Sequence, residues 1–322
     1  MRYIIGLIAA LTLAMPAQAE TYPARTINIV VALAAGTGMD SVVRLYADKL
    51  NQSLGKPVIV ENKPGSAGLA TVETVLQAQA DGHTLGAATS SIMAIRPSLF
   101  KAPPYDPLRD FIPISVYLKS PFILVVDPAL PVRSVPELIA YIKERPGKIS
   151  FSSSSVGGAP HLAAEHMKQR FDLDINHVPY RNSPQSIADV AAGHVSMAFA
   201  EAGASLPLIK DGKLRAIAVS SLTRLPSLPD VPTFAEASGV ADFEMVSWHV
   251  LIARAGTPET IIEKLQSELA RVFADPKMQE TVTALGLIPQ PAQSLAATRA
   301  YVASENEKWG ALVKKLGMAG SI

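Results

Sequence analysis

Hydrophobic positions along the chain follow two alternating periods. Residues 26–33 form a continuous run of apolar and β-branched side chains, which is typical of a buried strand. Residues 38–54 place apolar side chains every three or four positions, which predicts an amphipathic helix. Such alternation of strands and helices predicts an α/β fold with parallel sheets, and there are too many strands for one small sheet. The further predicted strands are 58–61, 84–89, 122–126, 149–153, 195–200 and 215–220.

The first nineteen residues have a different pattern. Arg2 precedes an apolar run at 4–15, and Ala17-Gln18-Ala19 then gives the small-x-small pattern that signal peptidase recognises. The alternative is an anchoring transmembrane helix, but the run is shorter than the ~20 residues that cross a bilayer. We therefore predict a signal peptide at 1–19, cleaved after Ala19, and a soluble protein exported to the periplasm.

Composition narrows the classes of protein that remain. The 322 residues suffice for about two domains, and 48% hydrophobic with 18% charged residues indicates a well-packed globular chain. Because 29 basic residues balance 28 acidic ones, no general electrostatic attraction to nucleic acid or an anionic membrane is expected. The absence of cysteine excludes disulfides, thiolate metal sites and a cysteine nucleophile. A charged ligand must therefore be recognised locally.

A small-residue turn joins the first strand to its helix and is the first candidate ligand loop. Free N–H groups and the helix dipole at such a turn favour an anion. The turn does not complete the dinucleotide-binding fingerprint, because Ser41 stands where glycine or alanine is required, and the sequence has no phosphate-binding GKS or GKT loop. The alternative is an ordinary strand-to-helix turn. The candidate ligand residues here are Ala35, Gly36, Thr37, Gly38 and Asp40.

The second candidate loop has the same construction. Residues 151–161 run from a strand into hydroxyls and glycines, and Pro160 then opens a helix. Hydroxyls and unpaired N–H groups satisfy a carboxylate without a countercharge. The alternatives are a flexible serine turn and a hydrolase in which one serine is the nucleophile and His161 the base, but the run lacks a GxSxG elbow and an identifiable acid. The candidate ligand residues are Ser152, Ser153, Ser154, Ser155, Gly157 and His161.

Metal and cofactor chemistry have little support in the sequence. There is no HExxH motif, and His161 and His166 are five positions apart, which puts them off a common helix face. We therefore predict neither a metal site nor a cofactor.

A series of short blocks carries a family resemblance. In this order they resemble the tripartite tricarboxylate transporter substrate-binding proteins, also called Bug receptors, and they span essentially the whole mature chain. The pattern differs where Ala35-Gly36-Thr37 replaces a Pro-Gly-Gly core and where Asn182 replaces the usual glycine. The blocks are Tyr22-Pro23, Gly36-x-x-x-Asp40, residues 60–68, 81–85, 105–107 with 110–111, 146–148, 161–165, 178–181, 212–216, 228–233 and 255–258.

The resemblance implies a fold and a function. The fold is a type II periplasmic-binding-protein fold, in which two α/β lobes joined by two crossing strands close like a Venus flytrap. We place one lobe at 20–121 plus 247–322 and the other at 122–246. The implied protein is a non-enzymatic, monomeric receptor that binds a small organic carboxylate, such as a dicarboxylate, a tricarboxylate or an aromatic acid, and delivers it to the membrane subunits of the transporter. The alternatives are a sensor module for a signalling partner and a secreted serine hydrolase.

The resemblance also orients the ligand between the two loops. One carboxylate is expected at the N–H groups of residues 36–40, together with hydroxyls of Thr37, Thr89, Ser90 and Ser91. Serines 152–155 and His161 are expected at the other end. Because neither loop contains lysine or arginine, we predict neutral donors as the main anchors, with Arg181 as the rival anchor. Glu201, which follows the strand at 195–200, completes the predicted site.

Overall fold

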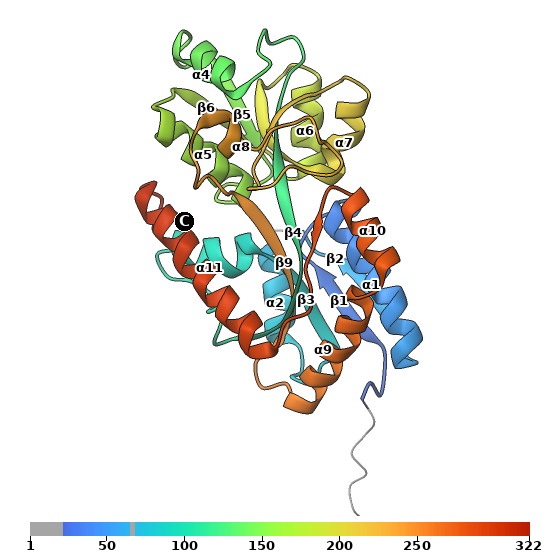
Figure 1. Ribbon diagram of the computed structural model, residues 1–322. Coiled ribbons are helices and arrows are strands. Elements are labelled where there is room, and N and C mark those ends of the chain that lie inside the picture. The colour runs from blue at the N-terminus through green and yellow to red at the C-terminus, as the bar shows by residue number, and fades with distance from the viewer. Residues whose placement is uncertain (1–21, 65–67) are drawn as a thin grey trace, which may run out of the picture.

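The computed structural model describes residues 22–64 and 68–322, and the predicted signal peptide lies outside these residues. The described chain forms two α/β lobes, one above the other in Figure 1, with two long strands running between them. These strands are β4 (Phe111–Val126) and β9 (Val246–Arg254), which pair antiparallel. The α/β prediction and the two-lobed fold with crossing strands are confirmed.

The first lobe is built on a mixed sheet with the strand order β2-β1-β3-β9-β4-β10. Here β1 lies between two parallel partners, while β9, β4 and β10 run antiparallel to their neighbours. The remaining elements of this lobe are β1 (Ile27–Val31), α1 (Gly38–Leu54), β2 (Val58–Asn62), α2 (Leu69–Gln77), β3 (Thr84–Thr89), a π-helical turn (Ser91–Ile95), α3 (Arg96–Leu99), α9 (Glu259–Phe273), α10 (Pro276–Ala284), β10 (Ile288–Pro289) and α11 (Leu295–Lys315).

The second lobe has the strand order β6-β5-β7-β4-β8. The end of β4, Phe122 to Val126, lies between β7 and β8, so the predicted strand 122–126 is the second half of a strand of 16 residues. The other elements are α4 (Val135–Lys143), β5 (Ile149–Ser153), α5 (Ala159–Phe171), β6 (Ile175–Pro179), α6 (Ser183–Ala191), β7 (Met197–Glu201), α7 (Ala202–Lys210), β8 (Arg215–Val219) and α8 (Phe234–Ser238).

The partners of β4 change between Pro121 and Phe122. Up to Pro121 the strand pairs with β9 in the first lobe, and from Phe122 it pairs with β7 in the second. The opposite position on β9 is Val246, the register partner of Pro121. The division into one lobe of residues 20–121 and 247–322 and another of residues 122–246 stays a prediction, as does the closing motion of these lobes.

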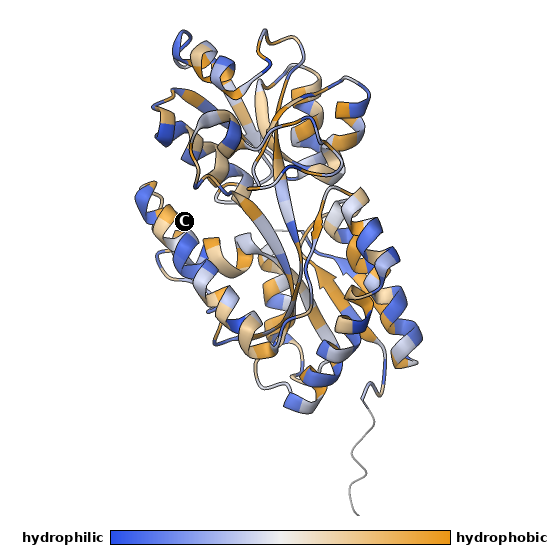
Figure 2. Ribbon diagram, viewed as in Figure 1, coloured by the Kyte–Doolittle hydropathy of each residue, from blue (hydrophilic) through white to orange (hydrophobic). Residues whose placement is uncertain are grey.

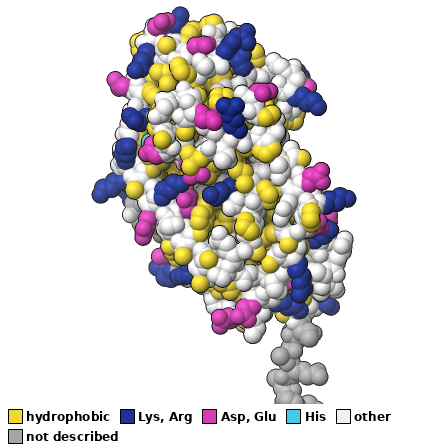
Figure 3. All heavy atoms as spheres, in the orientation of Figure 1, with side chains coloured by type: hydrophobic (Ala, Val, Ile, Leu, Met, Phe, Trp, Pro, Cys, Tyr) yellow, Lys and Arg dark blue, Asp and Glu magenta, His cyan; other side chains and the backbone are white. Residues whose placement is uncertain are grey.

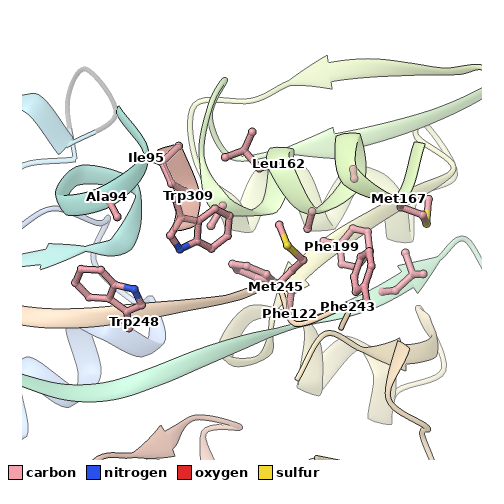
Figure 4. Close-up of a cluster of buried hydrophobic side chains, with 14 of the residues drawn as sticks. Ala94, Ile95, Phe122, Leu162, Met167, Phe199, Phe243, Met245, Trp248 and Trp309 are labelled. Carbon is pink, nitrogen blue, oxygen red and sulfur yellow. The ribbon is translucent and has the colours of Figure 1, made fainter. Parts of the chain in front are cut away.

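The largest hydrophobic core contains residues of both lobes and of the two crossing strands. Apolar residues are concentrated on the strands and on the inward faces of the helices in Figure 2. In Figure 4, Phe122 and Met245 stand between the two tryptophans of the first lobe and the second-lobe side chains. The two lobes are therefore joined by packed side chains as well as by two strands.

Both tryptophans meet one buried acid. The Oε2 atom of Glu305 accepts from Trp248 Nε1 at 2.8 Å and from Trp309 Nε1 at 2.9 Å. Because a buried indole N–H needs a partner, this carboxylate satisfies two donors at once and fixes α11 against β9.

No helix within residues 22–64 and 68–322 has the length and apolarity needed to cross a bilayer. On the face shown in Figure 3, acidic and basic side chains are interspersed over both lobes, in keeping with the near-zero net charge.

Candidate ligand-binding site

A cavity of about 70 Å³ with a mixed polar and apolar lining lies between the lobes, where the two long strands cross. This is several times the space that one water molecule needs, and enough for a carboxylate-sized group. The strands supply alternate residues to one face of the sheet: Ser120 and Phe122 from β4, and Ser247 and His249 from β9. Ser120 and Ser247 are directly opposite each other in the register. We call this space the inner chamber.

Seven of the sixteen predicted site residues line the inner chamber, and they come from both lobes. The other nine lie in the loops or strands behind the lining. The seven are Thr37, Thr89, Ser91, Ser154, Ser155, Arg181 and Glu201. The nine are Ala35, Gly36, Gly38, Asp40, Ser90, Ser152, Ser153, Gly157 and His161.

In the first loop, Asp40 organises the backbone instead of facing the chamber. Its Oδ2 accepts from the N–H of Gly36 at 3.0 Å, and its Oδ1 accepts from Asn62 Nδ2 at 2.9 Å. Arg44, one turn further along α1, is 3.0 Å from the same Oδ1. Burial alone would raise the pKa of Asp40, but these bonds outweigh it and lower the pKa. Asp40 is therefore ionised at neutral pH, and the Gly36 N–H is already used within the loop.

Thr37 has a similar internal role. Its hydroxyl donates to the carbonyl oxygen of Ala34 at 2.8 Å and accepts from the N–H of Asp40 at 3.3 Å, which caps α1. Thr37 still contributes to the chamber wall, but its one hydroxyl proton is committed to Ala34.

The second loop divides its four serines between the interior and the chamber. Ser152 is buried, where its hydroxyl donates to the carbonyl oxygen of Ser186. Ser153 donates to the carbonyl oxygen of Ser155 at 3.1 Å and lies 2.7 Å from His177 Nε2. Ser154 and Ser155 line the chamber, and neither hydroxyl forms a hydrogen bond with another residue that the structure describes. These two hydroxyls are therefore available to a ligand.

His161 faces the interior of the second lobe. Its Nδ1 accepts from the N–H of Gly157 at 3.0 Å, and its ring stacks on His177 with the ring centroids 4.0 Å apart. Burial is the main cause that lowers the pKa of His161 to about 3, so the ring is neutral. The hydrolase alternative requires the His161 ring to contact a serine that lines the chamber. In the described residues, the His161 ring nitrogen instead accepts from Gly157, and the histidine that contacts buried Ser153 is His177.

The lobes contact each other closely on both sides of the chamber. The Oγ of Ser91, from the first lobe, accepts from the N–H of Ala159 at the start of α5 at 3.1 Å. Gly157, with φ of +71°, lies so close to Leu99 that a Cβ at that position would overlap the leucine side chain. On the other side, a Cβ on Gly203 would stand 3.2 Å from the backbone nitrogen of Gly38. The two lobes are therefore in direct contact on both sides of the chamber.

Three ionisable residues line the inner chamber. Burial lowers the pKa of His249 to about 3, so this histidine is neutral at neutral pH. Burial raises the pKa of Glu201 to about 7, against a smaller opposing effect of the Ser183 hydroxyl. Arg181 is largely exposed and supplies the one fixed positive charge among the lining residues that the structure describes.

A wider outer groove of about 770 Å³ adjoins the inner chamber and shares six lining residues with it: Ala34, Pro64, Ser154, Ser155, Arg181 and Asn182. Its wall adds apolar side chains such as Leu69 and Phe100. The groove also contains Arg96, whose guanidinium is 5.3 Å from the Phe100 ring and whose Nε is buried without a hydrogen-bond partner. The site thus has a small interior rich in hydroxyl groups and a larger, more apolar mouth.

The described residues bring together no group of three histidine, cysteine, aspartate or glutamate side chains that could hold a metal ion.

Sequence reasoning missed twelve lining residues, and four of them had a readable signal. Ser120, Ser247 and His249 are polar positions inside apolar strand runs, and Phe122 continues their two-residue period. The other eight are Ala32, Leu33, Ala34, Pro64, Ile92, Pro160, Asn182 and Ser183, which are loop-wall residues or helix-start residues.

Comparison with known proteins identifies the class that this fold and cavity define. The model of the tripartite tricarboxylate transporter family receptor matches residues 42–318. Protein BugT of Bordetella pertussis is 34% identical over 316 residues, which cover 98% of this chain and 96% of BugT. The chain therefore belongs to the tripartite tricarboxylate transporter receptor family, whose members are solute-binding receptors, and the resemblance to Bug receptors is confirmed.

Two solved structures share the whole architecture. Rpa4515 of R. palustris, solved with adipate, is 32% identical with a TM-score of 0.88, and the match covers 92% of this chain and 99% of that chain. MatC of Rhodopseudomonas palustris, solved with bound malate, is 27% identical with a TM-score of 0.83, and the match covers 91% and 100%. Adipate and malate are both dicarboxylates.

Proposed function

We propose that the protein is a periplasmic receptor that captures a small organic carboxylate between its lobes and delivers it, chemically unchanged, to the membrane subunits of a tripartite tricarboxylate transporter. One observation carries this proposal: eight of the nineteen residues that line the inner chamber carry a hydroxyl group, and the chamber lies between the two lobes of a member of a family of solute-binding receptors. The adipate and malate bound by two relatives support a carboxylate as the ligand class.

The chemistry of the lining suits one carboxylate group in the inner chamber. The hydroxyls of Ser154 and Ser155 donate to an oxygen anion without an accompanying countercharge. Thr89 and Ser91, at the end of β3 and the start of the π-helical turn, offer hydroxyls from the opposite lobe. A ligand held by donors of both lobes stabilises the closed state, because it loses half of these contacts when the lobes separate.

The remainder of the ligand extends through the outer groove. This groove pairs apolar walls with two guanidinium groups, those of Arg96 and Arg181. It therefore suits a ligand with an apolar body and a second anionic end, such as a linear dicarboxylate. The receptor acts as a monomer, and no part of this role requires catalysis or a cofactor.

A thermal-shift panel of mono-, di- and tricarboxylates, with adipate and malate among them, tests the proposal. A carboxylate that binds the folded state raises the melting temperature in a concentration-dependent way, because ligand binding stabilises by mass action. Recovery of the compound unchanged after incubation, checked by mass spectrometry, separates a receptor from a hydrolase. A flat panel, or turnover of the bound compound, would contradict the proposed function.

A further inference from the structure

Glu201 is an acid in a chamber that we propose for an anion. It is the last residue of β7 and precedes α7, and its side chain makes no capping bond to that helix. Its strand partner is Phe122, which also lines the chamber. In the described part of the chain, Glu201 forms no ion pair, and the hydroxyl of Ser183, which also lines the chamber, is the polar group that lowers its pKa slightly against the effect of burial.

The surroundings of Glu201 do not supply a neutralising charge. From β4 the chamber receives Ser120 and Phe122, and from β9 it receives Ser247 and neutral His249. The second loop and α5 contribute Ser154, Ser155 and Pro160, and α6 contributes Ser183. Arg181, in the loop before α6, is the one cation in the described lining, and it is largely exposed at the mouth that the outer groove shares.

A carboxylate ligand in this chamber would lie beside the Glu201 carboxyl. Two ionised carboxylates that share a small site repel each other strongly, and such pairs hold one proton between them. A neutral carboxylic acid, in contrast, donates an O–H to a carboxylate oxygen in a strong hydrogen bond. The chamber therefore accepts a ligand carboxylate only when Glu201 carries its proton.

We propose that Glu201 binds the ligand as the neutral acid, donating its carboxyl proton in a hydrogen bond to a ligand carboxylate oxygen, so that ligand capture is coupled to proton uptake. This inference rests on the proposed function, since it requires a carboxylate in the inner chamber. It makes Glu201 the residue that sets the pH range of binding.

The direction of the pH effect follows from linkage. Burial raises the pKa of Glu201 to about 7 in the free protein, and an adjacent ligand carboxylate raises it further. Below that pKa Glu201 is already protonated, and affinity is independent of its titration. Above it, each ligand that binds brings a proton with it, so affinity falls by up to about tenfold per pH unit. An affinity that increased with pH would contradict binding by the protonated form of Glu201.

Two measurements test the proposal, one with ligand and one without. Calorimetry with adipate or malate at pH 8, in two buffers of different ionisation enthalpy, is expected to show uptake of close to one proton per ligand. Glu201→Gln keeps the shape and an N–H donor but has no titrating proton, so it is expected to bind with no proton uptake and with an affinity that is flat from pH 6 to pH 8.5. Glu73→Gln, at an exposed position on α2, is the matched control and keeps the uptake. Carbon-13 titration of the Glu201 carboxyl in the ligand-free protein is expected to give a pKa near 7.

Each result has a defined meaning. Carboxylate binding without proton uptake, uptake that persists in Glu201→Gln, or a free-protein pKa near the ordinary 4.5 overturns this inference and leaves the proposed function intact. A carboxyl that titrates near 7 in a protein that binds no carboxylate overturns the proposed function, and this inference with it.

Discussion

The two strand-to-helix loops at the chamber look alike in sequence and are used differently in the structure. In residues 34–40, the Gly36 N–H donates to Asp40 and the Thr37 hydroxyl donates to Ala34, so both groups are used within the loop. In the second loop, Ser153 is also used internally, but Ser154 and Ser155 face the chamber. The first loop is thus a preorganised wall and the second supplies ligand donors. Similar composition does not determine whether donors remain free, because that depends on which neighbours reach them.

The largest effect we expect is on stability, from a substitution that removes the internal hydrogen bonds of the first loop. Asp40→Ala removes the acceptor for the Gly36 N–H and for Asn62, and leaves Arg44 with Asn62 Oδ1 as its acceptor. Hydrogen bonds to a charged group contribute about 1.5 to 3 kcal/mol each, so the free energy of unfolding is expected to fall by about 2 to 4 kcal/mol. Urea denaturation measures it, with Asp48→Ala on the exposed side of α1 as the control.

The same variant gives a pH signature. Because the pKa of Asp40 is lowered in the folded state, its ionised form stabilises the fold above the ordinary pKa of 3.8, and this contribution is lost as the pH falls through the folded value. The stability gap between wild type and Asp40→Ala is therefore expected to be constant near pH 7 and to shrink in acid. A gap that widened in acid would show that the carboxylate is not the stabilising form.

The second loop is expected to divide its effects between stability and affinity. Ser153→Ala removes the contact with His177 and the bond to the Ser155 carbonyl, and is expected to cost about 1 to 2 kcal/mol of stability. Ser155→Ala is expected to leave the unfolding free energy within about 0.5 kcal/mol of wild type. Its carboxylate affinity is expected to fall roughly 10-fold to 100-fold. Equal stability losses in the two variants, with no change in affinity, would erase the distinction between them.

A smaller effect on ligand affinity is expected at the contact between Gly38 of the first loop and Gly203 in the second lobe. Gly203→Ala places a Cβ 3.2 Å from the backbone nitrogen of Gly38, which opposes full closure. Alanine is also the better helix former by about 1 kcal/mol, so stability without ligand is expected to hold or rise. Affinity is expected to drop about threefold to tenfold, with a larger radius of gyration at saturating ligand. Unchanged affinity would mean that this contact does not limit closure.

Much of the fold could be predicted because local signals and the family pattern agreed. The helix from Gly38 to Leu54 and the strand from Ile149 to Ser153 have the predicted bounds, since each has a clear hydrophobic period and a turn signal at its end. The length of β4 was missed because Pro121 interrupts the apolar run, although the strand continues through it.

The site was harder to predict because burial and hydrogen-bond partners are tertiary properties. Nothing in the four-serine run shows that Ser152 pairs with Ser186, or that Ser153 meets His177 from the next strand. The floor of the chamber was missed for a different reason. Ser120 and Ser247 lie far apart in sequence and become opposite partners only when β4 and β9 pair.

The central claim is that the neutral donors of the second loop, and not a guanidinium, are the main anchors of the ligand. Calorimetric titration of adipate into Ser154→Ala and Arg181→Ala tests it most directly, with Arg133→Ala as the control for a lost surface charge. The account predicts that Ser154→Ala weakens binding roughly 10-fold to 100-fold, while Arg181→Ala weakens it less than about fivefold. Binding abolished by Arg181→Ala and nearly intact in Ser154→Ala would contradict it.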